Sequence, residues 1–424
     1  MNDSTFAEYE SNVRSYCRSF PAVFRKASGD LIYDEAGNPY LDFLSGASSL
    51  NYGHNNGLIR QEITAYLQEE GIVHSLDMYT AAKRSFIEDF VTHILKPRGL
   101  DYKLQFPGPA GTNAVEAAMK LARKVTGRTN IIAFTNAFHG MSLGALSATT
   151  DPVKRSAAGI SLPGVTFMPY CGSLGSPDTT LEYMEKTLTN RGSGVEPPAG
   201  FLVELVQGEG GLNTATSEWL QGLASLARRL EVPLIVDDIQ AGCGRTGTFF
   251  SFEEMGITPD IVCLAKSLSG YGLPMALVLL KRELDVWQPG EHNGTFRGNN
   301  LGFVGASAAI RNYWRDRRFQ ESLAVKSAYI RQTLQDLCTL FPEGEAVVKG
   351  RGLMLGLDVK HGLLAETISR QAFTNGLIIE TCGRSDQVVK LLPPLTISDE
   401  NLKAGLGILR RSMEQVLEDT LLSV

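Results

Sequence analysis

The chain has 424 residues, with 46 acidic and 40 basic side chains and a formal net charge of −6. It contains no block of Lys and Arg, which argues against binding to nucleic acid or to an anionic membrane and favours small-molecule chemistry. The six cysteines are scattered, without the Cys and His spacing of a metal site, so we expect no metal ion and a reducing compartment. No apolar run reaches about 18 residues and the first residues are polar, so we also expect a cytoplasmic protein that does not contact a membrane.

The first part of the chain, residues 1–57, contains a short hairpin pattern. Two strand-like runs within residues 31–46 are joined at the turn sequence Ala36-Gly37-Asn38. Because two short strands cannot bury a core of their own, we expect this segment to pack with the C-terminal domain of the chain.

Residues 58–308 alternate helical patterns with short apolar runs. Helical patterns lie, for example, around residues 115–122 and 219–230. The apolar runs lack strict alternation, as strands buried on both faces do; they are residues 130–136, 165–170, 200–206, 232–239, 260–266 and 275–280. This alternation predicts a large α/β domain with a mostly parallel sheet flanked by helices.

Residues 309–424 have a different pattern, in which long helices precede mixed elements. Apolar runs at 352–359, 376–381 and 388–392 indicate strands, and helical patterns appear at about 363–375 and 399–418. We therefore expect a small α+β domain beside the large one.

Polar side chains are expected to meet at one edge of the large sheet, because ligands of open α/β sheets lie beyond the carboxyl ends of the strands. One run ends at Asp237 and is followed by Gln240, another ends at Lys266, and Gly111 and Thr112 begin a helix. Pyridoxal phosphate needs an amine for its aldehyde, an acidic partner for its ring nitrogen and an anion site for its phosphate. These residues supply one of each.

Each of these residues also has an ordinary structural explanation. Thr112 could be only a helix N-cap, Asp237 a buried and paired carboxylate, and Lys266 could extend its ammonium to solvent. Residues 242–247, GCGRTG, match the G-x-G-x-x-G pattern of dinucleotide sites. They open no helical pattern, and the next strand ends in a lysine rather than an acidic residue, so a dinucleotide site is disfavoured.

The stretch VDDIQAGCGRTGTFFSFEEMGITPDIVCLAKSLSGYGLPMA, residues 236–276, resembles the signature of the class III pyridoxal-phosphate aminotransferases. The similarity extends through GTNAVEAAMKLAR, FHGMSLGALSAT, VQGEGG, TFRGN and LLPPLTI, and so covers nearly the whole chain. The resemblance implies the aspartate aminotransferase fold, which is fold type I of the pyridoxal-phosphate-dependent transferases. It also implies pyridoxal 5'-phosphate as cofactor and a homodimer or larger homo-oligomer.

The same resemblance assigns roles to the residues at the strand ends. It implies that Lys266 is the Schiff-base lysine, Asp237 the partner of the ring nitrogen and Gln240 a contact to the cofactor hydroxyl. The Schiff base and partial burial would both depress the pKa of Lys266. The SLSGYG sequence that follows, residues 267–272, is interpreted as a flexible segment that lets the lysine swing.

Three further residues receive roles only through the resemblance. Phe138 would stack on the cofactor ring, His139 follows it, and Thr295 would reach the phosphate of the neighbouring subunit. Without the resemblance, the sequence favours ordinary structural explanations: Phe138 as a core aromatic, His139 as a buried imidazole and Thr295 as a turn residue.

A closer similarity, carried by RSFP, LDFLSGASSLNYGHNNG, GIVHSLDMYTAAKR and NGTFRGNN, is to the diaminobutyrate:2-oxoglutarate aminotransferases. It implies transfer of an amino group from L-glutamate to L-aspartate 4-semialdehyde, giving L-2,4-diaminobutyrate and 2-oxoglutarate, for ectoine or another product. Two alternatives stay open: another class III ω-aminotransferase or aminomutase of the same fold, and a catalytically silent binding protein.

Two positions differ from the ornithine-type members of that family. Met141 and Lys390 stand where those members have arginine. Arginine binds a carboxylate through a bidentate fork, which methionine lacks and lysine replaces with a point charge. Glu209 matches a family glutamate that can pair with the cation at position 390, so we predict a contact between Glu209 and Lys390 that opens for glutamate.

Overall fold

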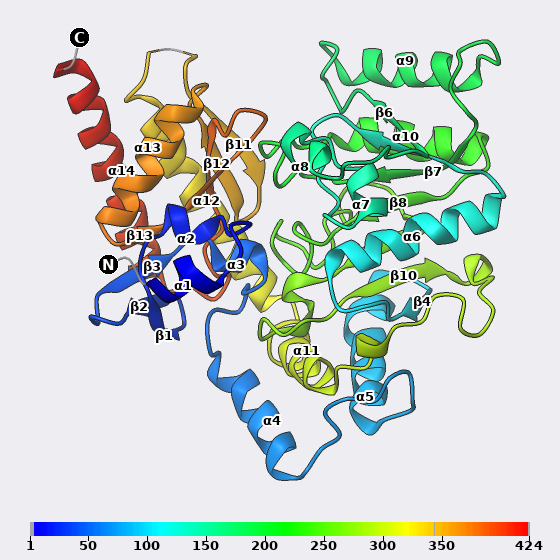
Figure 1. Cartoon of the computed structure of the whole chain (residues 1–424), viewed down its shortest axis with the longest axis horizontal. Helices are drawn as coiled ribbons and strands as arrows, with labels where there is room; N and C mark the ends of the chain where they lie inside the picture. The colour runs from blue at the N-terminus through cyan, green and yellow to red at the C-terminus, as the bar shows by residue number, and fades with distance from the viewer. Residues whose placement is uncertain (1–3, 343, 423–424) are drawn as a thin grey trace.

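The computed structural model describes residues 4–342 and 344–422, so the predicted ranges 1–57 and 309–424 include a few residues outside it. Within the described residues the strands form one seven-stranded and two four-stranded sheets. Figure 1 shows the large sheet on the right and the two small sheets on the left, where both ends of the chain also lie. In the described part of the chain, none of the helices has both the length and the apolar character needed to span a membrane.

The seven-stranded sheet has the strand order β4-β10-β9-β8-β7-β5-β6. Its strands are β4 Tyr102–Gln105, β5 Asn130–Phe134, β6 Val165–Met168, β7 Pro198–Val203, β8 Leu234–Asp237, β9 Ile261–Leu264 and β10 Leu277–Lys281. Strands β5 to β9 pair in parallel, and β10 is antiparallel to both β9 and β4. The six predicted strands and the mostly parallel sheet are thus confirmed, whereas β4 was missed because its sequence, YKLQ, is short and half polar.

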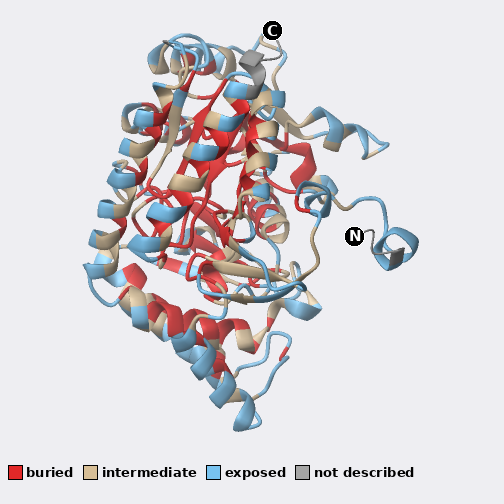
Figure 2. Cartoon of the chain, turned by 90° about the vertical axis from the view of Figure 1, so that its left-hand side faces the viewer, coloured by how far each residue is buried: buried red, intermediate tan, exposed pale blue. Residues whose placement is uncertain are grey.

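Helices cover both faces of this sheet, as the burial pattern of its strands requires. Ile131, Ala133 and Ile235 pack with the apolar face of one helix, α6 Gly111–Thr126. Their neighbours along the strands point the other way and pack with Trp219 and Leu223 of α10 Ser217–Arg229. Figure 2 shows the buried residues, in red, gathered along the strands between the helices. Successive strand residues bury opposite faces, which is why these runs are continuously apolar.

The remaining helices associated with the large sheet precede, connect and follow its strands. They are α4 Gly57–Gln68, α5 Ala81–Asp89, α7 Leu143–Ser147, α8 Pro152–Ser156, α9 Pro177–Thr189 and α11 Asn300–Tyr313.

One small sheet contains strands from both the N-terminal and the C-terminal part of the chain. It has the order β1-β2-β3-β13, in which β3 and β13 pair in parallel. The strands are β1 Phe24–Ser28, β2 Leu31–Asp34, β3 Pro39–Asp42 and β13 Leu377–Ile378. The predicted hairpin is therefore present as β2 and β3, and a C-terminal strand completes the sheet. Short helical segments flank it, α1 Ser4–Tyr9, α2 Tyr16–Ser19 and α3 Ser45–Ser48.

The other small sheet lies entirely in the C-terminal part. Its order is β11-β12-β15-β14, with strands β11 Val347–Arg351, β12 Met354–Asp358, β14 Glu380–Cys382 and β15 Val388–Leu391. Its helices are α12 Arg318–Cys338, α13 Gly362–Thr374 and α14 Asp399–Leu422. The predicted single strand at 376–381 was wrong, because the chain changes sheet at Ile379 and divides this run between β13 and β14.

Candidate active site

Lys266 lies two residues after the end of β9, beyond Ala265, and begins a short 3-10 turn, Lys266–Ser269. Its backbone is left-handed, with φ of 50°, and its Nζ donates a hydrogen bond to the carbonyl oxygen of Ala47 at 2.8 Å. Burial lowers the pKa of Lys266, although the nearby Glu209 opposes this shift. The predicted depression is confirmed. The next three residues are buried within the turn, which differs from the flexible segment expected there.

Asp237 is the last residue of β8, and it contacts a buried imidazole. His139 Nδ1 lies 2.7 Å from Asp237 Oδ2. Burial acts to lower the pKa of His139, but the hydrogen bond and charge of Asp237 outweigh it and raise that pKa. His139 Nε2 is buried and has no hydrogen-bond partner among the described residues. One nitrogen of this ring is therefore committed to Asp237, and the other is available to a ligand.

Glu204, which the sequence analysis did not select, lies beside this pair. It directly follows β7 and is 7% exposed. Its two carboxyl oxygens accept hydrogen bonds from the backbone N–H groups of Phe138, at 3.0 Å, and Gly208, at 3.1 Å. Burial raises its pKa to about 7, assisted by Asp237 and opposed by His139. The rule that selected Asp237, a polar residue at the carboxyl end of a buried strand, also identifies Glu204.

Gly111 and Thr112 occupy the first turn of α6, as predicted, but Thr112 is not its N-cap. That position belongs to Ala110, so the alternative explanation of Thr112 was wrong. The Thr112 hydroxyl instead shares a 2.5 Å hydrogen bond with that of Ser142. A Cβ at position 111 would lie 3.1 Å from Ile239, so only glycine fits without displacing it. The first turn carries no acidic residue, so its free N–H groups suit an anion.

Lys390 is fully buried between two carboxylates. Its Nζ lies 3.0 Å from Glu209 Oε1 and 2.9 Å from Glu380 Oε1, and it donates to the Gly208 carbonyl at 3.1 Å. The predicted contact between Glu209 and Lys390 is confirmed. Gln240 Nε2 also donates to Glu209 Oε1, at 3.3 Å. Glu380 faces Lys390 across the pair of β14 and β15, and the sequence analysis missed it because no motif marks that strand.

The charges of this cluster shift one another's pKa values in opposite directions. Burial alone would raise the pKa of Glu209, but Lys390 and Lys266 outweigh it and lower it to about 2. Burial raises the pKa of Glu380, and Lys390 only partly offsets that. Burial would lower the pKa of Lys390, yet the two carboxylates raise it well above its ordinary value. Lys390 is therefore charged at neutral pH. Its single positive charge can neutralise only one of the two carboxylates, Glu209 and Glu380.

Three other residues selected from the sequence lie at the margin of this group. Phe138 is partly buried, with Lys154 Nζ 5.6 Å from its ring centroid. Met141 is 51% exposed. Thr295 is exposed, and its carbonyl accepts a 2.7 Å hydrogen bond from His74 Nε2.

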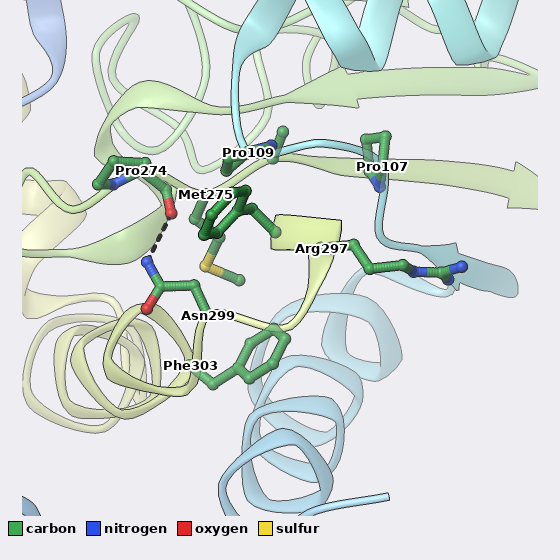
Figure 3. A pocket seen from close by; sticks show the side chains of 9 residues that line it. Pro107, Pro109, Pro274, Met275, Arg297, Asn299 and Phe303 are labelled. Atoms are coloured by element: carbon green, nitrogen blue, oxygen red, sulfur yellow. Dashed lines mark hydrogen bonds between the residues drawn. The ribbon is translucent and has the colours of Figure 1, made fainter. Parts of the chain in front are cut away.

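A small cavity of about 10 Å³ separates the segment after Thr295 from the loop that precedes α6. Figure 3 shows Pro107 and Pro109 of that loop on one side and Asn299 and Phe303 on the other, with the Asn299 side chain hydrogen-bonded to the Pro274 carbonyl at 2.9 Å. The volume suffices for about one water molecule. This cavity is too small for a substrate.

The cluster fits pyridoxal phosphate by its donor set. It offers an amine of lowered pKa on Lys266, a carboxylate on Asp237, a helix start at Gly111 and a partly exposed ring on Phe138. The buried Gln240 Oε1, like His139 Nε2, has no hydrogen-bond partner among the described residues, so a polar ligand would complete it. No group of three or more His, Cys, Asp or Glu in the described part of the chain is placed to hold a metal ion.

Comparison with known proteins gives consistent matches over nearly the full length. Residues 14–413 match the family described as Aminotransferase class-III. The chain is 54% identical to a diaminobutyrate--2-oxoglutarate transaminase of Halalkalibacterium halodurans, over 98% of this chain and 97% of that one. It is also 54% identical to the protein of that name from Vibrio cholerae, over 96% and 98%.

Among solved structures, the ornithine aminotransferase of Toxoplasma gondii superimposes with a TM-score of 0.84. The two chains share 26% identity, and the match covers 98% of this chain and 94% of that one. That structure has partial occupancy of pyridoxal phosphate at its active site.

Proposed function

Because the chain belongs to the class III aminotransferases, which use pyridoxal phosphate, we propose that it transfers the amino group of L-glutamate to L-aspartate 4-semialdehyde. The products are L-2,4-diaminobutyrate and 2-oxoglutarate, and the diaminobutyrate serves ectoine or a related product. The observation that carries this proposal is the 54% identity, over nearly the whole chain, to proteins named diaminobutyrate--2-oxoglutarate transaminase.

Residues from several segments would hold the cofactor. The start of α6 at Gly111 and Thr112 would receive its phosphate, Phe138 would contact its ring and Gln240 would contact its hydroxyl group. When bound, pyridoxal phosphate withdraws electrons from the substrate carbon that loses a proton. Asp237, oriented by His139, keeps the ring nitrogen protonated for that purpose.

Lys266 moves the proton. Its amine would hold the cofactor aldehyde between turnovers and would be free while substrate is bound. Once free, the amine accepts the proton from the donor Cα, and its lowered pKa increases the neutral fraction that can do so near pH 7. The Ala47 carbonyl, 2.8 Å from Nζ, orients the amine between these steps.

Lys390 supplies the positive charge for a donor carboxylate. It pairs with Glu209 and Glu380 before substrate arrives. The Glu209 side chain is 33% exposed, whereas that of Glu380 is 9% exposed, so Glu209 is the partner that can turn away. We expect glutamate to replace Glu209 at Lys390, and the semialdehyde, which has no second carboxylate, to leave this pair closed.

A homodimer is the proposed active unit, located in the cytoplasm. Residues 73–75 form backbone hydrogen bonds with residues 298–300. Thr295 lies beside them, since its carbonyl accepts a hydrogen bond from His74. Six large apolar side chains within or beside these two segments are exposed: Ile72, Val73, Leu76, Met78, Tyr79 and Phe296. Such a patch marks a protein contact. A second copy of the chain would cover it and receive Thr295 at its phosphate site.

A substrate panel tests the proposed function. Purified enzyme with pyridoxal phosphate and glutamate is offered aspartate 4-semialdehyde and ω-aldehydes of other lengths, and amino-acid products are identified by mass spectrometry. Diaminobutyrate should form fastest, and Lys266→Ala should form none. A preference for another aldehyde, or an internal shift of the amino group without 2-oxoglutarate release, would instead identify another enzyme of the family. No product from any aldehyde would indicate a binding protein.

A further inference from the structure

The four residues of the short segment α3 form a left-handed turn. Ser45, Gly46, Ala47 and Ser48 have φ values of 48°, 55°, 54° and 72°. Only one of them is glycine, and left-handed backbone is unfavourable for the other three. Asp42 Oδ1 accepts hydrogen bonds from the N–H groups of Leu44 and Ser45, at 2.9 and 2.8 Å. Such a conformation persists only where surrounding contacts enforce it.

The active-site lysine, Lys266, contacts this left-handed turn directly. The carbonyl of Ala47 accepts the hydrogen bond from Lys266 Nζ at 2.8 Å. The carbonyl of Ser48 accepts a hydrogen bond from the hydroxyl of Ser267, also at 2.8 Å. Two successive residues of the lysine turn are thus fixed by two successive carbonyls of the left-handed turn.

One side chain, Arg245 of the GCGRTG sequence, holds the turn in place. It is fully buried. Its Nε donates to Ser48 Oγ at 2.9 Å and its Nη2 to Asn51 Oδ1 at 2.6 Å. Its Nη1 donates to the carbonyl oxygens of Pro393 at 2.6 Å and Leu353 at 3.3 Å. One guanidinium therefore joins the left-handed turn to two loops of the C-terminal part.

The hydrogen bonds of Arg245 suit positioning better than charge pairing. Within the described part of the chain, every hydrogen-bond acceptor of this guanidinium is neutral. A buried charge is costly unless all its donors are satisfied. The planar guanidinium binds the Ser48 hydroxyl and the backbone carbonyls of Leu353 and Pro393 at once. It therefore fixes these three segments relative to one another, which the single ammonium of a lysine could not do.

We propose that Arg245 is a positioning residue for Lys266, acting through Ser48 and the Ala47 carbonyl. Arg245 keeps the left-handed turn in place, and the turn presents Ala47 to the lysine amine whenever it is not bonded to the cofactor. The amine is thereby returned to one position before it accepts the proton of the donor Cα. The inference rests on the aminotransferase function proposed above, but only on its glutamate half-reaction.

The test compares three variants. Arg245→Lys keeps the charge and loses the fork. Ser48→Ala removes one acceptor of the arginine and leaves the Ala47 carbonyl. Arg128→Lys is the matched control, because Arg128 Nη1 also donates to two backbone carbonyls, of Pro198 at 3.0 Å and Leu230 at 3.1 Å, and contacts neither Lys266 nor the turn. Thermal unfolding of each variant verifies that it is folded.

Two measurements report on Lys266. The first is single-turnover removal of the α-proton from glutamate, with and without deuterium at that carbon. The second is the rate at which apoenzyme captures pyridoxal phosphate, followed by absorbance. Since misplacement of a reacting group by about 1 Å costs up to about a hundredfold, Arg245→Lys and Ser48→Ala should slow proton removal about tenfold to a hundredfold. Their KM for glutamate should change less than about threefold, with a larger isotope effect and slower capture.

The outcomes separate the two proposals. Ser48→Ala decides the matter if Arg245→Lys does not fold. Wild-type rates of proton removal and capture in the folded variants, or the same losses in Arg128→Lys, would overturn the positioning role. A wild-type enzyme that removes no α-proton from glutamate would overturn the proposed function instead.

Discussion

His139 Nδ1 and Asp237 Oδ2 lie 2.7 Å apart, and this contact joins the end of β8 to the loop after β5. Both side chains are buried, and Asp237 Oδ1 separately accepts the N–H of Ile239 at 3.2 Å. The carboxylate is therefore fixed in orientation from two sides. A carboxylate fixed in this way needs no reorganisation when a cationic partner binds.

The first prediction concerns this pair. His139→Leu removes a hydrogen bond to a charged group, which is worth about 1.5–3 kcal/mol, so kcat should fall about tenfold to a hundredfold. Steady-state kinetics with glutamate measure it. His361→Leu changes an exposed histidine at the start of α13 and should leave kcat unchanged. Equal kcat in the His139 variant and wild type would show that Asp237 does not depend on the imidazole.

The second prediction concerns pH. The pKa of Glu204 is raised to about 7 in the folded protein, whereas an unfolded glutamate titrates near about 4.3. Between these values the folded state binds more protons than the unfolded one, so stability falls as pH rises. The melting temperature of wild type should decrease from pH 5 to pH 8, and Glu204→Gln should reduce that decrease. An identical pH dependence in both proteins would contradict the shift.

The third prediction concerns Lys390. Lys390→Ala leaves Glu209 and the buried Glu380 without their cation, so the free energy of unfolding should drop by about 3–5 kcal/mol. KM for glutamate should rise about tenfold or more, because the donor carboxylate loses its partner. Urea unfolding and steady-state kinetics measure these effects.

Lys349 provides the control for Lys390. It lies on the same sheet, 3.6 Å from Asp358, and its side chain is 26% exposed. Lys349→Ala should cost at most about 1 kcal/mol. Unchanged kinetics in Lys390→Ala with both glutamate and the semialdehyde would exclude a role in binding the donor.

The fourth prediction concerns assembly. Phe296 is 65% exposed and belongs to the apolar patch beside Thr295. Phe296→Asp places a charge in the proposed interface, so light scattering should show monomer and activity should fall with it. Val325→Asp provides the control, since Val325 is 72% exposed on α12 and outside the patch. An active monomer would show that the site is complete within one chain.

The sequence predicted the large sheet well because burial on both faces leaves a clear signal. The runs that became β5 to β10 are continuously apolar, and the carboxyl ends of the parallel strands β5 to β9, with the polar residues there, lie at one edge. Asp237 and Lys266 were found by that rule alone. Glu204 obeys the same rule and was overlooked, because it stands beside Leu205 and Val206, which extend the apolar run.

Other features depend on contacts that local sequence does not encode. Three of the four residues in the left-handed turn are not glycine, so no pattern marks it. The contact of Glu380 with Lys390 could not be predicted from local sequence, because it depends on the pairing of β14 with β15. Arg245 lay inside a pattern that was assessed only for its glycines. Its four acceptors come from residues 48, 51, 353 and 393, which are distant in sequence.

The parallel pairing of β3 with β13 sets an order of events during synthesis. Leu41 and Asp42 find their partners, Leu377 and Ile378, only after nearly the whole chain has left the ribosome. Until then the N-terminal hairpin presents an unpaired edge, which can bind other chains. Premature termination before β13 would therefore leave a fragment prone to aggregate, although its large sheet is already complete.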